Sequence, residues 1–307
     1  MYELHQVGEN SYYIDCPAKI GIYLASDTDA YLIDSGNDKD AGKKIRKILD
    51  EHGWTLKGIL NTHSNADHIG GNQYLQQQTG CKIFADGIEA AFTEYPILEP
   101  SFLYGGYPCK DLCHKFLLAK PSEVTKLKSN LAAAPLPSDS GFTDGDFPKE
   151  IEVIPLKGHF FDMVGFRTPD DVVFLADCLS SKETLDKYRI GFIYDIAEYL
   201  KTLETVKTLK AKTFIPAHAP VTDNISELAE YNISVVNSIA EDIVSICKEP
   251  ICFEKILQRL FDDYKLTMNF EQYVLVGSTV RSYLSWLKDT GRLYADFLDN
   301  MLVWSAL

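Results

Sequence analysis

The chain has 307 residues, of which 46% are hydrophobic and 24% charged, a composition typical of a globular protein with enough chain for one large domain or a large and a small one. Lys and Arg number 30 against 44 Asp and Glu, a formal net charge of -14 that opposes binding to nucleic acid or to an anionic membrane. No apolar run reaches the roughly 18 residues that a spanning helix needs, and no basic segment followed by an apolar one opens the sequence. We therefore expect a cytoplasmic protein without membrane contact.

Short β-rich runs alternate with helical ones up to about residue 222, which is typical of a layered α/β domain. Apolar residues recur at helical spacing within 40–54, and a final glycine closes the helical pattern that precedes it. The expected elements, in chain order, are strands within 12–34, a helix over 40–54, a strand over 58–62, a helix over 70–80 and a strand over 82–85.

The regular alternation stops between about residues 86 and 150. An aromatic-rich stretch at 101–108 is followed by a turn-rich one at 135–141. Insertions of this length in compact domains are usually functional, so we interpret it as a lid over a site or as a dimer contact. Beyond it the pattern resumes, with strands expected at 151–156, 163–168 and 172–176, a helix over 194–209 and a strand at 213–216.

The last part of the chain, 223–307, is expected to form a second, mostly helical domain after the first one at 1–222. A long helix, two shorter helical stretches and a terminal β-hairpin follow one another, which is the layout of a winged helix. Winged helices are usually associated with DNA, but residues 225–307 carry 7 Lys and Arg against 12 Asp and Glu, a balance that opposes phosphate contact.

Four of the seven histidines lie just after predicted strands, beside small residues or carboxylates. Residues 61–68 read Asn-Thr-His-Ser-Asn-Ala-Asp-His, so a strand there ends in several metal-ligating side chains before a helix begins. His159, Asp177 and His218 each follow a later strand. Imidazole and carboxylate groups are the ligands that zinc and similar ions prefer, and a sheet edge could bring these side chains to one point.

In the order and spacing of these residues, the sequence resembles the metallo-β-lactamase superfamily along roughly residues 1–222, and its C-terminal segment is similar to the extra domain of glyoxalase-II-like and β-lactamase-like hydrolases. The resemblance implies an α/β fold, an αββα sandwich with a small, mostly helical C-terminal domain. It also implies a first metal site with His63 and His159, a second with Asp67, His68 and His218, and Asp177 bridging both.

One position departs from the family motif, because Asn65 stands where its second histidine is expected. An amide oxygen is a weaker and harder ligand for zinc than imidazole. We therefore expect one firmly held metal ion at the second site, with Asn65 as at best a weak ligand of the first. Zinc, as one or two ions, is the expected metal, with iron or manganese as alternatives.

A metal of this kind lowers the pKa of bound water from 15.7 toward about 7 and so supplies hydroxide at neutral pH. The resemblance thus implies a metal-dependent hydrolase of a small ester, thioester or amide-type substrate, with Asp67 orienting or deprotonating the water. Two alternatives stay open: an iron-dependent oxidoreductase of the same fold, and a binding module in which Asn65 has ended catalysis. The expected partner is a small molecule, with a homo-oligomer as a further expectation.

Overall fold

The computed structural model describes residues 2–127 and 147–307, so the turn-rich stretch at 135–141 lies outside the described residues. The chain forms two compact units, and each unit is built from three separate segments of the sequence. The first unit contains residues 1–157, 161–179 and 210–224, and the second contains 158–160, 180–209 and 225–307. The predicted domain boundary at residue 222 stays a prediction.

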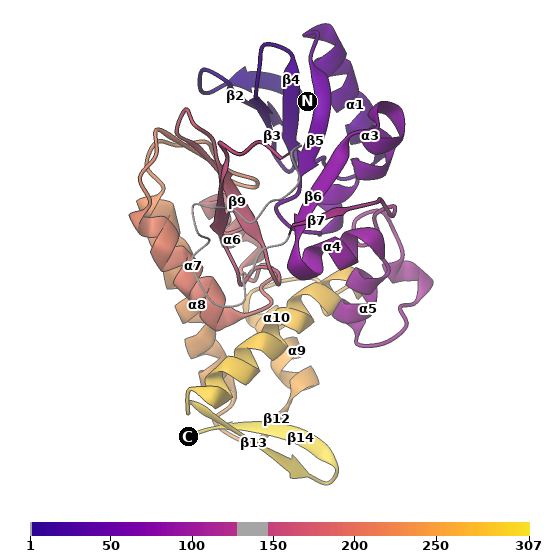
Figure 1. The fold of residues 1–307 in the computed structure, drawn as a ribbon. Helices are drawn as coiled ribbons and strands as arrows, with labels where there is room; N and C mark the ends of the chain where they lie inside the picture. The colour runs from indigo at the N-terminus through magenta and orange to yellow at the C-terminus, as the bar shows by residue number, and fades with distance from the viewer. Residues whose placement is uncertain (1, 128–146) are drawn as a thin grey trace. The chain divides into compact units, whose positions relative to one another are not determined.

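The first unit is built on two sheets, of which the larger has seven strands in sequence order (Figure 1). The strands up to β4 pair antiparallel, whereas the strands from β4 to β7 are parallel. The seven strands are β1 (Glu3–Gln6), β2 (Ser11–Asp15), β3 (Ile20–Leu24), β4 (Asp29–Ile33), β5 (Thr55–Leu60), β6 (Lys82–Asp86) and β7 (Thr125–Leu127).

The second sheet of this unit has the order β11-β10-β9-β8, in which β10 and β11 are parallel and the other pairs antiparallel. The predicted strands and the hairpin between β9 and β10 are confirmed. Asp171, in the hairpin turn, has a φ of 68°, a backbone conformation that Asp tolerates better than most residues. The four strands are β8 (Glu152–Pro155), β9 (Val164–Arg167), β10 (Val172–Ala176) and β11 (Thr213–Pro216).

Alternate residues of the larger sheet serve two different cores, as the period of two along a strand requires. Tyr23, Ile33 and Phe84 share one buried cluster with Phe166 and Phe174 of the second sheet. On the opposite face, another cluster includes strand residues and the apolar side of the surface helix, namely Ile20, Ile22, Leu32, Ile59, Ile83, Ile45 and Leu49. The two sheets therefore pack face to face, with helices over the outer side of the larger one.

Helices α1 (Lys39–Glu51) and α3 (Asn72–Thr79) contact each other and both flank the larger sheet (Figure 1). The Asp38 carboxylate caps α1 by accepting hydrogen bonds from the backbone N–H groups of Asp40 and Ala41, both at 2.9 Å. Gly80 ends α3 with a φ of 68°, the left-handed conformation that favours glycine. Both helices were predicted, and their bounds differ from the prediction by no more than three residues.

The segment after β6 is more regular than its sequence indicates, which corrects the expectation that the strand–helix pattern stops there. It contains α4 (Gly87–Glu94), α5 (Leu98–Tyr104) and the short 3-10 helix η1 (Lys110–Leu112) before β7 extends the larger sheet. Two of its glutamates, Glu89 and Glu99, are buried. Helices of seven or eight residues with buried acids show too little hydrophobic periodicity to be recognised.

The second unit is mostly helical and has a small sheet of its own, with strands in the order β12-β14-β13. The terminal hairpin was predicted, but the last helix is longer than expected, with 20 residues. Tyr283 is fully buried and its hydroxyl donates to the carbonyl of Val236 at 3.3 Å. The elements are α6 (Lys182–Tyr188), α7 (Ile196–Thr208), α8 (Ser226–Ile246), β12 (Ile251–Cys252), α9 (Phe253–Asp263), α10 (Phe270–Asp289), β13 (Leu293–Leu298) and β14 (Met301–Ala306).

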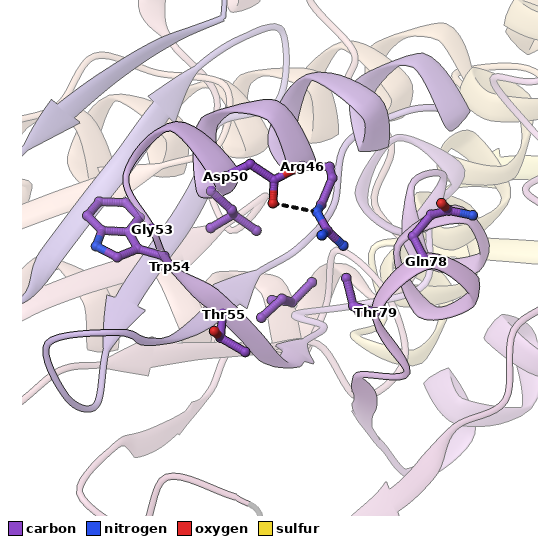
Figure 2. Close-up of a pocket in the computed structure, with 9 residues that line it drawn as sticks. Arg46, Asp50, Gly53, Trp54, Thr55, Gln78 and Thr79 are labelled. Atoms are coloured by element: carbon purple, nitrogen blue, oxygen red, sulfur yellow. Dashed lines mark hydrogen bonds and ion pairs between the residues drawn. The ribbon is translucent and has the colours of Figure 1, made fainter.

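A surface cavity of about 420 Å³ lies among the ends of α1 and α3 and the start of β5 (Figure 2). Its cation, Arg46, donates to the Asp50 carboxylate at 2.8 Å, so that charge is already paired. None of the predicted site residues lines this cavity. Among the described helices, none combines the length and apolar character needed to cross a membrane.

The turn around Gly70 provides a test of this packing. A Cβ at residue 70 would lie 2.2 Å from the carbonyl carbon of Asn37, and backbone atoms cannot move aside as a side chain can. We expect Gly70→Ala to lower the free energy of unfolding by about 1–3 kcal/mol, as overpacking does elsewhere. Gly106→Ala is the matched control, since the nearest atom to its Cβ is 4.0 Å away. Urea denaturation would measure both, and equal stabilities would contradict the model of close packing.

Candidate metal centre

The predicted site residues of the first unit lie at the ends of parallel strands. His63 follows β5, Asp177 follows β10 and His218 follows β11. Asp67 and His68 lie on the short helix α2 (Ala66–Ile69), which begins soon after β5. Because the carboxyl ends of parallel strands meet at one edge of a sheet, side chains from both sheets can converge there.

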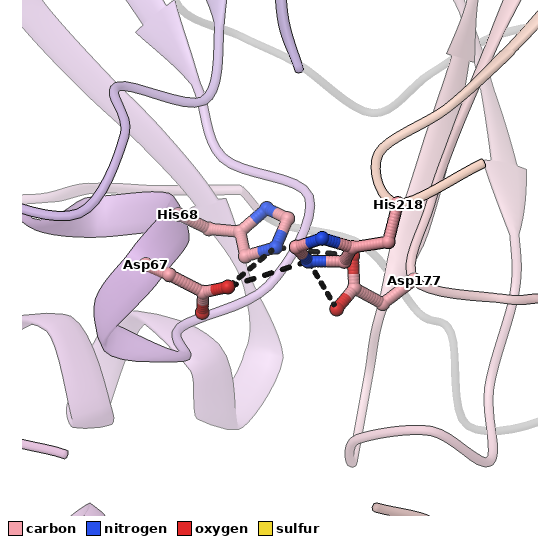
Figure 3. Close-up of side chains that lie close together, drawn as sticks. All are labelled: Asp67, His68, Asp177 and His218. Atoms are coloured by element: carbon pink, nitrogen blue, oxygen red, sulfur yellow. Dashed lines mark ion pairs between the residues drawn. The ribbon is translucent and has the colours of Figure 1, made fainter. Parts of the chain in front are cut away.

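Asp67, His68, Asp177 and His218 form one cluster, in which one ligand atom from each lies within 4.8 Å of the others. Asp67 and His68 approach from one side, and Asp177 and His218 approach from the other (Figure 3). The Nε2 atom of His68 is 3.0 Å from Asp177 Oδ1 and 3.8 Å from Asp67 Oδ2, and the Nε2 atom of His218 is 3.3 Å from an oxygen of each carboxylate.

The outer nitrogens of both imidazoles are held by hydrogen-bond acceptors. His68 Nδ1 lies 2.7 Å from the carboxylate of Asp34, and His218 Nδ1 lies 3.0 Å from the backbone carbonyl of Pro17. An acceptor at Nδ1 fixes the proton on that nitrogen and leaves Nε2 as the coordinating atom. Both Nε2 atoms face the two carboxylates, so the ring orientations suit a shared cation.

The same contacts shift the pKa of each group. Burial raises the pKa of Asp177, but His218 and His68 outweigh that effect and hold it well below its usual range. Asp67 is shifted in the same direction, again against burial, by His68 and His218. Burial lowers the pKa of His218, yet Asp177 and Asp67 together raise it to about 10. The carboxylates are therefore ionised throughout the physiological range.

The cluster is more accessible on one side than on the other. The side chain of His68 is fully buried and that of Asp177 is 12% exposed, whereas His218 and Asp67 are 31% and 35% exposed. The exposed atoms of the cluster therefore belong mainly to Asp67 and His218.

The two remaining histidines of the predicted set belong to different units. His63 is buried, and its ring centre lies 4.1 Å from that of His68; one ligand atom of His63 also lies within 4.8 Å of one on Asp177. His159 belongs to the second unit, where its ring meets the ring of Phe192 edge-on at 5.5 Å. The pairing of His159 with His63 stays a prediction.

The residue before Asp177 adopts a conformation that L-residues seldom accept. Ala176 has a φ of 49°, and the register between β10 and β11 shifts between Phe174 and Ala176. Left-handed backbone costs a non-glycine residue roughly 1–2 kcal/mol, and bulges often redirect a side chain beside a functional site. Here the irregularity turns the chain immediately before a cluster residue.

Residues 61–68, which contain His63, Asp67 and His68, are called the ligand loop below. Three buried acids that support this loop were not predicted from the sequence. Asp34 accepts hydrogen bonds from the backbone N–H and the hydroxyl of Thr62 at 2.8 and 2.7 Å, in addition to its contact with His68. Glu89 accepts from the N–H and hydroxyl of Ser64 at 3.0 and 2.5 Å. Glu99 accepts from the Asn65 amide at 2.8 Å. An acid within an apolar run, as in Ile88-Glu89-Ala90, was the available signal.

Burial also changes the acidity of two of these supporting groups. It raises the pKa of Glu89 to about 7, although Ser64 and the backbone N–H of Asp162 act in the opposite direction. It raises the pKa of Glu99 well above its usual value, against the hydrogen bond from Asn65. Both acids therefore differ from the cluster carboxylates, which imidazoles keep ionised.

The donor set of the cluster fits a divalent cation. Two imidazole nitrogens and two ionised carboxylates are ligands accepted by zinc, iron and manganese. A bound cation would take the place of the imidazole protons, and the two carboxylates would then match its charge of two. The acceptors behind both rings match the outer hydrogen bonds that metal-ligating histidines almost always make. Asp67, His68, Asp177 and His218 are therefore the residues that would hold one ion.

Comparison with known proteins identifies the family. The model of the metallo-beta-lactamase superfamily matches residues 10–218. Among solved structures, a beta-lactamase domain protein from Burkholderia ambifaria has a TM-score of 0.73 at 14% identity, over 99% of this chain and 94% of its own. A metallo-beta-lactamase family protein from Thermus thermophilus has a TM-score of 0.67 at 14% identity, over 97% and 99%. These likenesses show the fold.

Two curated relatives align over shorter stretches. A beta-lactamase-like protein 2 homolog of Drosophila melanogaster is 25% identical over 224 residues, which are 72% of this chain and 65% of that protein. A hydroxyacylglutathione hydrolase of Rhodopseudomonas palustris is 43% identical over 63 residues, or 20% of this chain and 24% of its own. The alignments thus span less than two thirds of these relatives. With the fold, the ligand cluster and a family match over most of its length, the chain belongs to the metallo-β-lactamase superfamily.

Proposed function

We propose that this protein is a metal-dependent hydrolase of a small ester, thioester or amide-type substrate. The observation that carries the proposal is the cluster of Asp67, His68, Asp177 and His218, whose ligand atoms lie within 4.8 Å of one another. The fixed outer nitrogens of both imidazoles support it, because they prepare the inner ones for a cation. The superfamily to which the chain belongs consists mostly of hydrolases.

Three residues of the cluster have distinct roles in this proposal. A divalent ion held there would polarise a carbonyl oxygen and lower the pKa of bound water toward about 7. His68 and Asp177, the two most buried members, hold and orient the site. Asp67 is the most exposed of the four, so we assign to its carboxylate the task of orienting the attacking water and accepting its proton.

The proposed substrate class rests on charge and on the relatives. A formal net charge of -14 disfavours polyanionic substrates such as nucleic acid. The relative from Rhodopseudomonas palustris is named a hydrolase of hydroxyacylglutathione, which supports an acyl group as the point of attack. Zinc is the proposed ion, and a second position with His63, His159 and Asp177 is proposed as the weaker one. A cytoplasmic location and self-association stay predictions.

Metal content tests the centre before any substrate is known. We expect about one zinc per chain in protein purified without added metal or chelator, and close to none in Asp177→Ala, because that change removes the carboxylate which both imidazoles face. Elemental mass spectrometry gives the ratio. Iron in place of zinc would redirect the proposal to oxygen chemistry, and protein without any metal would favour a binding module.

The acid behind His68 offers a second test. We expect Asp34→Asn to weaken zinc affinity about 10- to 100-fold, the usual cost of losing an outer partner of a metal-ligating histidine. Asn suits the left-handed backbone that residue 34 adopts, with a φ of 64°. Competition with a chromophoric chelator would measure the affinity. Asp29→Asn, in an exposed ion pair with Lys57, serves as control, and equal losses in both variants would exclude a specific role for Asp34.

Chelation tests the reaction. The wild-type protein is expected to hydrolyse at least one member of a panel of p-nitrophenyl esters, acyl thioesters and lactones, to lose that activity after dialysis with a chelator and to regain it with zinc. The reason is that the proposed ion supplies the positive charge that polarises the carbonyl. Asp177→Ala should not be rescued by zinc. Activity that survives chelation, or metal-loaded protein inactive on the whole panel, would refute the proposal.

A further inference from the structure

Two buried glutamates, one from each helix after β6, hold neighbouring residues of the ligand loop. Glu89 on α4 accepts from Ser64, and Glu99 on α5 accepts from Asn65. The two residues are 1% and 3% exposed. Ser64 and Asn65 lie between His63 and Asp67, so these contacts flank the side chains that would bind metal. The segment expected to be a lid or a dimer contact therefore supports the loop.

Asn65 occupies the N-cap position of α2 but does not use its side chain as a cap. Its amide nitrogen instead donates to Glu99 Oε1 at 2.8 Å. Glu99 also accepts a hydrogen bond from the backbone N–H of Ala66, the first residue of the helix. The glutamate thus satisfies the helix start that an N-cap side chain ordinarily satisfies.

The backbone of Asn65 connects this contact to the cluster. Its carbonyl accepts hydrogen bonds from the N–H groups of His68 and Ile69 at 2.9 and 3.3 Å. A shift of residue 65 therefore moves Asp67 and His68 with it. The contact with Glu99 also engages the nitrogen of the Asn65 amide, which is a hydrogen-bond donor and offers no lone pair to a cation.

We propose that Glu99 positions the metal-ligand loop by holding Asn65 and the start of α2, so that Asn65 is a positioning residue and not a metal ligand. This inference rests on the proposed function, since it takes Asp67, His68, Asp177 and His218 as the residues that bind the ion. It assigns a role to the position at which the sequence departs from the family motif, and it makes Glu99 part of the same device.

Exchange of the Asn65 amide and the Glu99 carboxyl group distinguishes a positioning role of Asn65 from a role as metal ligand. In Asn65→Asp, an acid replaces the amide that donates to Glu99, so two carboxyl groups would face each other at hydrogen-bond distance and could not both be ionised there. A positioning role predicts a roughly 10- to 100-fold loss of zinc affinity, whereas a ligand role predicts tighter binding or a second ion. In the double variant Asn65→Asp with Glu99→Gln, the new amide can donate to Asp at 65 while its oxygen accepts from Ala66.

Zinc affinity by chelator competition and zinc per chain are the first readouts. We expect the double variant to return to within about 3-fold of wild type, because interacting residues are not additive. Glu123→Gln, at an exposed carboxylate, is the control and should bind zinc as wild type does. Tighter binding or an added ion in Asn65→Asp would overturn the proposal, as would a double variant no better than the single one.

Hydrogen–deuterium exchange over residues 60–70 of the zinc-free proteins gives a readout that does not depend on metal. Exchange should be faster in Asn65→Asp than in wild type and slow again in the double variant. If wild type binds no zinc, the proposed function fails, and this comparison still decides the role of Glu99. If Asn65→Asp does not fold, recovery of the fold in the double variant supports the proposal, and no recovery overturns it.

Discussion

The carboxylate of Asp34 is the contact on which the candidate centre depends. It lies after β4, is 3% exposed, and accepts from the N–H and hydroxyl of Thr62 and from the ring of His68. Burial of an ionised acid is unfavourable unless such donors compensate for the lost water. The three donors connect two neighbouring strand ends with the imidazole. The other nitrogen of His68 then meets Asp177 from the second sheet.

Much of the fold follows from local signals that the sequence contains. Strand and helix periods predicted the four strands of the second sheet and those of the larger sheet except β1 and β7. Gly80 marked the end of α3, and the turn at Asp171 joined β9 to β10, as expected. The helices after β6 were not recognised, since seven or eight residues with a buried acid show no clear periodicity. The seven-stranded order and the parallel pairing depend on contacts between distant segments, which periodicity does not specify.

The metal-ligating side chains of the candidate site were predicted, but the buried acids that hold them in place were not. His68, Asp67, Asp177 and His218 were predicted because their order and spacing resemble the family motifs, and the structure brings the four together. Asp34 and Glu99 each contact a residue 34 positions away. A single sequence does not reveal such a pair, because the residue type alone shows neither whether an acid is buried nor which distant residue it contacts. The sequence therefore predicted Asn65 only as a weak metal ligand and did not reveal its hydrogen bond to Glu99.

Because the chain alternates between its two compact units, a truncated fragment can separate helices that pack together. The polypeptide passes between them five times, and α6 and α7 belong with the C-terminal helices although they precede β11. Helix α7 packs against α8, with Tyr199, Leu203 and Val206 buried. A fragment truncated after residue 222 would keep α7 without α8 and so expose apolar surface prone to aggregation. A fragment that keeps the buried face of α7 covered therefore has to include α8.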